Sequence, residues 1–141
     1  MISLFALSPL LAQDIFNGYT LFCPLTDGPI TGGGENYSRL MDNNGNIINQ
    51  WHHDRCAATA PYLMPDSTLI CPFKIENPYI AGSAYGGKII RYGWSGNILW
   101  EYDYSDTNYI QHHDIEPMPN GNILIISWDR KTYLEVLSSG R

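Results

Sequence analysis

The sequence predicts an all-β protein, and three observations lead to this prediction. The 141 residues include 13 Gly and 9 Pro, which favours many turns, and 13% are aromatic, which is enough to build a buried core. Only 16% are charged, and no long run rich in Ala, Glu, Lys, Leu and Arg occurs, which excludes a coiled coil or a helical bundle. Short apolar runs that alternate with polar residues between Gly-Asn pairs are typical of strands joined by tight turns.

The first twelve residues differ from the rest and predict a signal-peptide-like segment, residues 1–12. The run from Ile2 to Ala12 is apolar except for two serines. It is too short to cross a bilayer as a helix and has the length of a secretory h-region, although no Lys or Arg precedes it. We therefore expect export, to the periplasm or the outside of the cell, with residues 13–141 as the folded part. A buried first strand is the alternative.

Two kinds of hairpin recur along the chain. Each joins two short apolar runs through a turn containing Gly, Asn or Asp, residues that accept the positive φ of tight hairpin turns. The first kind covers Tyr37–Trp51 and Lys88–Tyr102, whose Gly-Asn pairs are 51 positions apart, and the second covers Tyr62–Ile70 and Glu116–Leu124, whose turn prolines are 54 positions apart. Interleaved hairpins at this spacing predict a repeating four-stranded unit, such as the blade of a β-propeller.

The four hairpins amount to roughly two blades, whereas a propeller closes with about four to eight. We therefore expect an incomplete β-propeller, with residues 13–141 as the N-terminal part of a larger one. Assembly of several copies is a second way to complete the ring, and an ordinary β-sandwich is the alternative fold. After the last hairpin, Thr132 is expected to cap a short helix that ends before Gly140.

The last predicted strand has two apolar faces, which suits a blade with neighbours on both sides. Because side chains alternate along a strand, the first face should carry Ile123, Ile125 and Ser127, and the second should carry Leu124, Ile126 and Trp128.

Charge and cysteine content limit the classes of partner. The formal net charge is −6, which argues against binding to a nucleic-acid backbone. No segment is long and apolar enough to predict a membrane span. Cys23, Cys56 and Cys71 are odd in number, so at least one stays unpaired. A disulfide between Cys56 and Cys71 and three separate buried thiols are both compatible with the sequence.

All four histidines lie in two copies of one tripeptide, His52-His53-Asp54 and His112-His113-Asp114. The second copy directly precedes a predicted inner strand, the strand that lines the channel of a propeller, so its imidazoles are the better candidates for chemistry. An imidazole beside a carboxylate can act as an oriented base, a nucleophile or a metal ligand. The first copy follows Trp51 at the end of an outer hairpin, where we expect a solvated connector.

Three other motifs give weaker or no functional signal. Zinc bound between the two His-His-Asp copies is an alternative, but adjacent histidines on a strand should point to opposite faces, so each copy would offer one ligand. Gly82–Lys88 has the spacing of a phosphate-binding loop, yet Ile89 replaces the hydroxyl residue and a strand should follow. We interpret Gly32-Gly33-Gly34 as a flexible turn and Asp42–Asn46 as a hairpin turn rather than a calcium loop.

The run Tyr109-Ile-Gln-His-His-Asp-Ile-Glu-Pro-Met-Pro-Asn-Gly-Asn-Ile-Leu-Ile-Ile-Ser-Trp128 resembles the arylsulfate sulfotransferase family of exported bacterial β-propellers. The segments Gly18–Leu25 and Met41–Trp51 are also similar to the N-terminal part of such proteins. The resemblance implies transfer of a sulfuryl group from a phenolic sulfate ester to a phenolic acceptor, through a transient sulfohistidine and without a cofactor.

The resemblance implies roles for few residues of this chain. His113, with Asp114 beside it, matches the His-Asp step that opens an inner strand in the family, and we expect it to bind or stabilise the sulfuryl group. His112 is the alternative. The family's nucleophilic histidine and its partner arginine belong to later blades, so the 141-residue chain alone is expected to be inactive. The alternative function is a secreted, non-enzymatic propeller that binds a glycan or a protein through Tyr79, Tyr85 and Tyr104.

Overall fold

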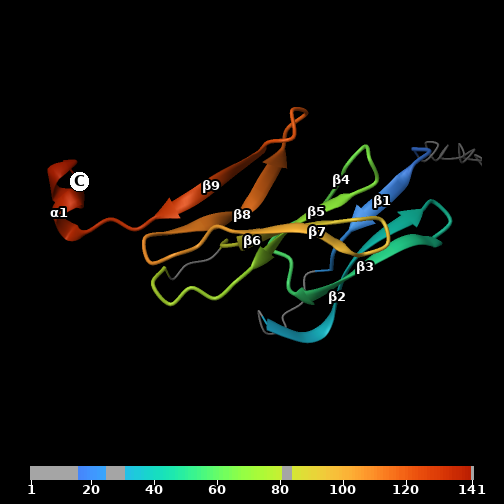
Figure 1. Cartoon of the computed structure of the whole chain (residues 1–141), viewed down its shortest axis with the longest axis horizontal. Coiled ribbons are helices and arrows are strands. Elements are labelled where there is room, and N and C mark those ends of the chain that lie inside the picture. Colours follow the sequence, from blue (N-terminus) through green and yellow to red (C-terminus); the bar gives the residue numbers. More distant parts are fainter. Residues whose placement is uncertain (1–15, 25–30, 81–83, 141) are drawn as a thin grey trace, which may run out of the picture.

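The computed structural model describes residues 16–24, 31–80 and 84–140, and for 31–35 it describes the backbone alone. The signal-peptide-like segment 1–12 lies outside these residues. The described chain is all-β apart from one short helix, and its strands form three separate antiparallel sheets (Figure 1). No described sheet closes on itself.

The first sheet has three strands in the order β1-β2-β3. They span Tyr19–Phe22, Thr31–Asp42 and Ile47–Arg55. The register places Ser38 opposite Trp51 and Leu21 opposite Leu40. The predicted hairpin at Tyr37–Trp51 is therefore confirmed as β2–β3.

The second sheet has four strands in the order β4-β5-β6-β7. They span Tyr62–Leu63, Leu69–Lys74, Gly87–Tyr92 and Ile98–Asp103. Tyr62 pairs with Ile70, and Cys71 pairs with Ile90. This sheet contains both kinds of predicted hairpin. The strand expected after the Gly82–Lys88 motif is β6, which begins at Gly87, and residues 82 and 83 lie outside the described residues.

The third sheet has two strands, β8 and β9, and the helix α1 follows it. The elements span Tyr109–Pro117, Ile123–Asp129 and Tyr133–Ser138. Thr132 caps the helix, since its side chain accepts a hydrogen bond from the Glu135 backbone and the Glu135 side chain bonds back. Gly140 follows with a φ of 76°. The predicted cap and stop are confirmed.

The three sheets pack face to face through two apolar clusters. The first joins β1–β3 to β4–β7, and its fully buried side chains include Trp51, Leu69 and Phe73. The second joins β4–β7 to β8–β9 through Ile70, Ile89 and Ile115. The middle sheet is therefore covered on both faces, because alternate residues of β5 and β6 point into different clusters.

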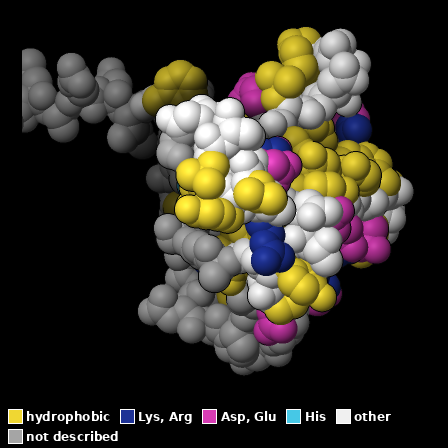
Figure 2. All heavy atoms as spheres, turned by 90° about the vertical axis from the view of Figure 1, so that its left-hand side faces the viewer, with side chains coloured by type: hydrophobic (Ala, Val, Ile, Leu, Met, Phe, Trp, Pro, Cys, Tyr) yellow, Lys and Arg dark blue, Asp and Glu magenta, His cyan; other side chains and the backbone are white. Residues whose placement is uncertain are grey.

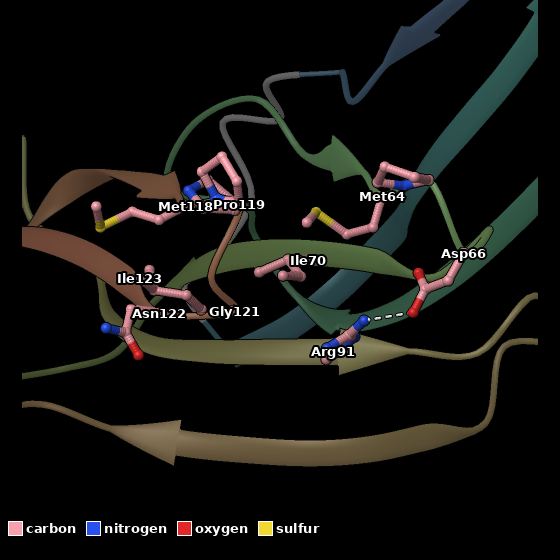
Figure 3. A pocket seen from close by; sticks show the side chains of 11 residues that line it. Met64, Asp66, Ile70, Arg91, Met118, Pro119, Gly121, Asn122 and Ile123 are labelled. Atoms are coloured by element: carbon pink, nitrogen blue, oxygen red, sulfur yellow. Dashed lines mark hydrogen bonds and ion pairs between the residues drawn. The ribbon is translucent and has the colours of Figure 1, made fainter.

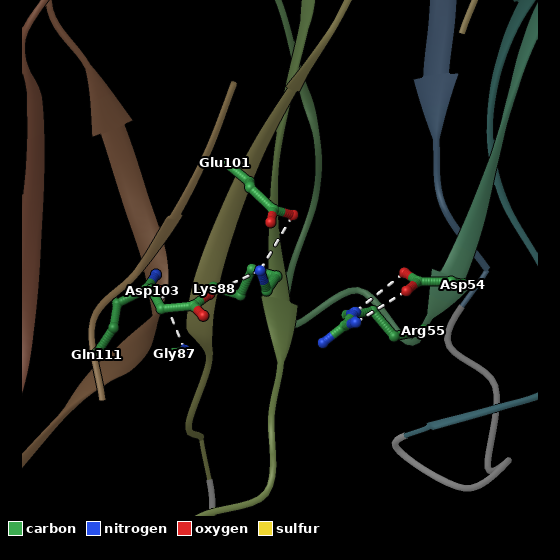
Figure 4. A network of polar contacts seen from close by, with 7 residues as sticks. All are labelled: Asp54, Arg55, Gly87, Lys88, Glu101, Asp103 and Gln111. Carbon is green, nitrogen blue, oxygen red and sulfur yellow. Dashed lines mark hydrogen bonds and ion pairs between the residues drawn. The ribbon is translucent and has the colours of Figure 1, made fainter. Parts of the chain in front are cut away.

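A buried cation lies at one end of the middle sheet. Lys88 of β6 is 8% exposed and pairs with Glu101 at 3.1 Å and with Asp103 at 2.8 Å, both on β7 (Figure 4). The two carboxylates offset the cost of desolvating the ammonium group. Arg55 pairs with its neighbour Asp54 in the same region.

The structure also describes the triple glycine, the three cysteines and the length of the helix. Gly32-Gly33-Gly34 is not a turn but part of β2, where pairing with β3 is irregular between Thr31 and Asn36. No disulfide joins Cys56 to Cys71. Both residues are buried, and half-buried Cys23 packs against the first apolar cluster, to which Cys71 belongs. Among the described residues, no helix is long and apolar enough to cross a membrane.

All four hairpin turns contain a residue with positive φ. The residues are Gly45, Gly96 and Gly121, each at 85°, and Ser67 at 64°. In the β4–β5 and β8–β9 turns, Ser67 and Gly121 occupy equivalent places, since each donates its N–H to the carbonyl of a methionine, Met64 or Met118. Only Ser67 has a Cβ that the left-handed region disfavours.

Ser67→Gly should therefore raise the free energy of unfolding by about 0.5–1 kcal/mol, because the left-handed strain is removed. Urea denaturation measures this change. Gly121→Ser is the matched reverse substitution and should lower the free energy of unfolding by a similar amount, since no side chain surrounds Gly121 within 4 Å. Equal effects of the same sign from both variants would contradict the assignment of strain to the turn.

Candidate functional site

The second His-His-Asp copy lies in a bulge of β8. Gln111 pairs with Ser127 and Ile115 pairs with Ile125, so three residues of β8, 112–114, stand opposite the single residue Ile126 of β9. A bulge inserts residues that the partner strand cannot pair and turns their side chains away from the regular alternation. The His-His-Asp tripeptide is therefore the irregular part of an otherwise regular strand.

The bulge brings the two imidazoles together. The rings of His112 and His113 are 4.2 Å apart between centroids and nearly perpendicular. We expected adjacent histidines to point to opposite faces. This is confirmed for exposed His52 and buried His53 of β3, but it is wrong for His112 and His113, because the bulge interrupts the alternation there. The His112 ring also lies 5.5 Å from the ring of Trp128 on β9.

Each histidine is held through its backbone by the segment before β6. The N–H of His113 donates to the carbonyl of Ala84 at 3.0 Å, and Tyr85 forms an isolated bridge with His112. Ala84 has a φ of 62°, a conformation that is uncommon outside glycine. Backbone strain of this kind gathers at functional sites and persists only where the surroundings impose it.

The two ring nitrogens of His113 differ in environment. Nδ1 is buried and has no hydrogen-bond partner. Nε2 has no partner among the described residues, and the residue as a whole is half-buried, so Nε2 is the nitrogen left for a ligand. An imidazole with one accessible nitrogen can donate to an anion or attack an electrophile, depending on its tautomer.

Asp114 does not orient either imidazole. Its Oδ1 accepts hydrogen bonds from the Tyr62 hydroxyl at 3.1 Å and from the Ile115 N–H at 2.9 Å. Burial, the hydrogen bond to Asp114 and the charges of Asp114 and Glu116 raise the pKa of Tyr62 to about 12. The carboxylate therefore fixes the end of the bulge to β4 of the preceding sheet.

Gln111 is a residue of the site that the sequence did not single out. Its side chain is fully buried, and its Oε1 accepts a hydrogen bond from the Gly87 N–H at 3.1 Å (Figure 4). Its backbone carbonyl accepts from Gly86, whose own Cβ, if present, would meet Gln111 Oε1 at 3.0 Å. Gln111 and Gly86 together hold the 84–87 segment against β8, next to His113.

The first His-His-Asp copy is placed differently from our expectation. It belongs to β3 and not to a solvated connector. His52 is exposed, but His53 is 9% exposed and packs between the rings of Phe73 and Tyr92. Its Nε2 lies 2.8 Å from the hydroxyl oxygen of Ser38. His53 is a core residue because β2 and β5 cover it, which the tripeptide alone does not reveal.

The side chain of Arg91 is engaged in contacts away from the histidines of β8. Arg91 of β6 donates to Asp66 at 2.7 Å and to Thr68 at 2.9 Å. It borders a hollow of about 300 Å³ between the two proline turns, 65–68 and 117–123 (Figure 3). This hollow lies beyond the C-terminal end of β8 and is lined by neither His112 nor His113, so Arg91 does not join them.

The alternative of a zinc site finds no donor set. In the described part of the chain, no three side chains of His, Cys, Asp or Glu converge as metal ligands would. His53 is buried in the first apolar cluster, whereas His112 and His113 belong to the third sheet. The two tripeptides are therefore not brought together.

Comparisons with known proteins give no independent identification. No family model, no curated protein and no solved structure matches the chain.

The buried His53 should make the fold less stable in acid. Burial lowers the pKa of His53 to about 4, so between about pH 6.5 and pH 4 the unfolded chain binds a proton that the folded chain does not. The free energy of unfolding should therefore fall as the pH falls, with His53 contributing about 2 kcal/mol between pH 7 and pH 5. Urea denaturation at the two pH values measures this loss.

His53→Gln should reduce that pH dependence, and His52→Ala, which changes an exposed ring, should preserve it. An unchanged difference between pH 7 and pH 5 in His53→Gln would contradict the neutral buried imidazole.

Proposed function

We propose that this chain supplies a sulfuryl-group binding site to an exported, arylsulfate-sulfotransferase-like β-propeller. The observation that carries the proposal is the bulge of β8, which presents the touching imidazoles of His112 and His113 with Nε2 of His113 accessible. The same segment carries the resemblance to the sulfotransferase family.

The arrangement of the sheets supports the propeller part of the proposal. Antiparallel sheets follow one another along the chain, each is built from consecutive hairpins, and neighbouring sheets pack face to face. Blades of a propeller are related in this way. In the proposed propeller, β8 is the innermost strand of its blade, because it is the first strand of its sheet along the chain.

Sulfuryl transfer needs groups that stabilise a spread negative charge. In the proposed reaction an imidazole nitrogen attacks sulfur, the N–S bond forms as the S–O bond to the donor breaks, and the phenolate leaves with the electron pair. The acceptor phenol then attacks sulfur, releases the imidazole and gives its proton to a base. We assign His113, with His112 beside it, to hold the sulfuryl oxygens during these steps.

Asp114 has a positioning role in this proposal. It contacts Tyr62 and the backbone of Ile115, so it sets the shape of the bulge and not the protonation of an imidazole. The nucleophilic histidine and its arginine are not among the residues that we assign. For this reason we expect the 141-residue chain to bind an aryl sulfate without transferring its sulfuryl group.

Tyrosines around the end of β7 favour a second candidate function. The rings of Tyr104 and Tyr109 are 4.5 Å apart, and that of Tyr102, on the other side of Tyr104, is 6.4 Å away. Tyr102 is 55% exposed, and so is Tyr79. Sugars stack on such rings, so a glycan-binding propeller is the alternative, and binding on a glycan array without aryl-sulfate binding would favour it.

Isothermal titration of the chain with 4-nitrophenyl sulfate tests the first proposal. We expect binding that weakens at least about tenfold in His113→Ala, which corresponds to about 1.4 kcal/mol. The loss of the accessible Nε2 is the physical reason. 4-Nitrophenol, which lacks the sulfate, should bind much more weakly.

His52→Ala serves as the matched control, since His52 is exposed on another sheet, and it should bind like the unchanged chain. Equal affinity of the unchanged chain and of His113→Ala would show that the assigned site is wrong. Release of 4-nitrophenolate by the chain alone would contradict the expectation that it is inactive.

A further inference from the structure

The outer side of the third sheet is apolar and uncovered. Leu124 is 56% exposed, Ile126 is 70% exposed and Trp128 is 48% exposed, while Ile123 and Ile125 on the other face pack against the middle sheet. Figure 2, which views the molecule from the end that carries α1, shows hydrophobic side chains gathered there between charged ones. The predicted two-faced pattern of β9 is confirmed, but no other described sheet covers the face of Leu124, Ile126 and Trp128.

The internal repeat shows how equivalent positions are covered. At the 54-residue step, Ile70 and Pro72 of β5 correspond to Leu124 and Ile126 of β9. Ile70 is 3% exposed and Pro72 is fully buried. The same side of β5 that is buried against the next sheet is therefore open in β9.

The edge of β9 is open as well. Strand β1 is extended by the hairpin β2–β3, and β5 is extended by the hairpin β6–β7, whereas among the described strands β9 pairs with β8 alone. Residues 118 and 122 are joined by a backbone hydrogen bond, and so are residues 108 and 130. Because hydrogen-bonded pairs alternate in an antiparallel ladder, the N–H groups of Ile123, Ile125 and Ser127 point to the free edge.

The equivalent groups of β5 already have their partner. Leu69, Cys71 and Phe73 correspond to Ile123, Ile125 and Ser127, and they face Tyr92, Ile90 and Lys88 of β6. A long apolar edge strand is a template for strand addition. The free edge of β9 therefore presents its backbone hydrogen-bonding groups at the positions equivalent to those through which β5 pairs with β6.

We propose that β9 is a docking strand for a β-hairpin of the same repeat, which adds to its free edge as β6–β7 adds to β5. The occupant is an antiparallel hairpin with apolar residues on both faces and a Gly-Asn turn. A second copy fits less well, because each copy carries a net charge of −6 and Asp114 and Glu116 line a hollow of about 410 Å³ beside Leu124. An anionic lipid surface is disfavoured by the same charges.

The proposal does not depend on sulfuryl transfer, since it concerns the backbone edge and apolar face of β9. Its test appends a copy of Gly87–Asp103 to the chain through a flexible linker of about 12 residues, which raises the local concentration of the hairpin. Amide hydrogen exchange then follows residues 123–127. We expect exchange at Ile123, Ile125 and Ser127 to slow at least tenfold relative to the chain without the hairpin.

The matched control changes the appended copy alone and leaves the parent chain intact. Ile90→Pro in that copy removes an N–H that faces the docking strand, and it should return exchange at Ile125 to the rate of the unextended chain. Ser127→Pro in the parent strand should have the same effect.

Two results would overturn the proposal. One is exchange at Ile123, Ile125 and Ser127 that stays fast with the hairpin or slows equally with a scrambled one. The other is an unextended chain that is dimeric by light scattering with these amides already protected, since a second copy would then be the occupant.

Discussion

Burial of the middle sheet on both faces is the constraint on which the rest of the structure depends. Strand β5 has apolar residues on both of its faces. If either face were exposed to water, the fold would lose the stabilisation that apolar burial provides. In β5, Leu69 and Phe73 enter the cluster with β1–β3, and Ile70 enters the cluster with β8–β9. The β4–β7 sheet therefore requires a neighbouring sheet on each side, and the order of the three sheets follows from this requirement.

The same packing fixes the candidate site. Ile110 and Ile115 are buried on either side of the bulge, so β8 is anchored at both ends while residues 112–114 lie between them unpaired with β9. Gln111 and the Ala84 carbonyl hold the backbone of this stretch, and Tyr62 holds Asp114. The two imidazoles owe their contact to this anchoring. The site is therefore positioned by the buried ends of β8 and by the segment that precedes β6.

Local turn chemistry explains why much of the fold was predictable. The Gly-Asn turns, the alternation of β9 and the Thr132 cap are set by neighbouring residues, and the structure confirms them. The bulge was not predictable, because it adds two residues to β8, and two extra residues leave Gln111 and Ile115 on the same face as in a regular strand. The burial of His53 depends on Ser38, Phe73 and Tyr92, which three other strands supply. The composition of Gly32–Gly34 predicts a turn, but these residues belong to β2, between the pairs that Thr31 and Asn36 make with β3. Gln111 carried no motif, and only its buried contact with Gly87 reveals its role.

The central claim is that consecutive sheets of one repeat stack face to face and that this stacking places the paired imidazoles of β8. Nuclear Overhauser spectroscopy of the methyl-labelled chain tests it most directly. The account predicts cross-peaks from the Ile115 methyl groups to Ile70 and Ile89, together with contacts between the ring protons of His112 and His113. Ile115 methyl groups that contact β8 and β9 alone, with no contact between the two imidazoles, would contradict it.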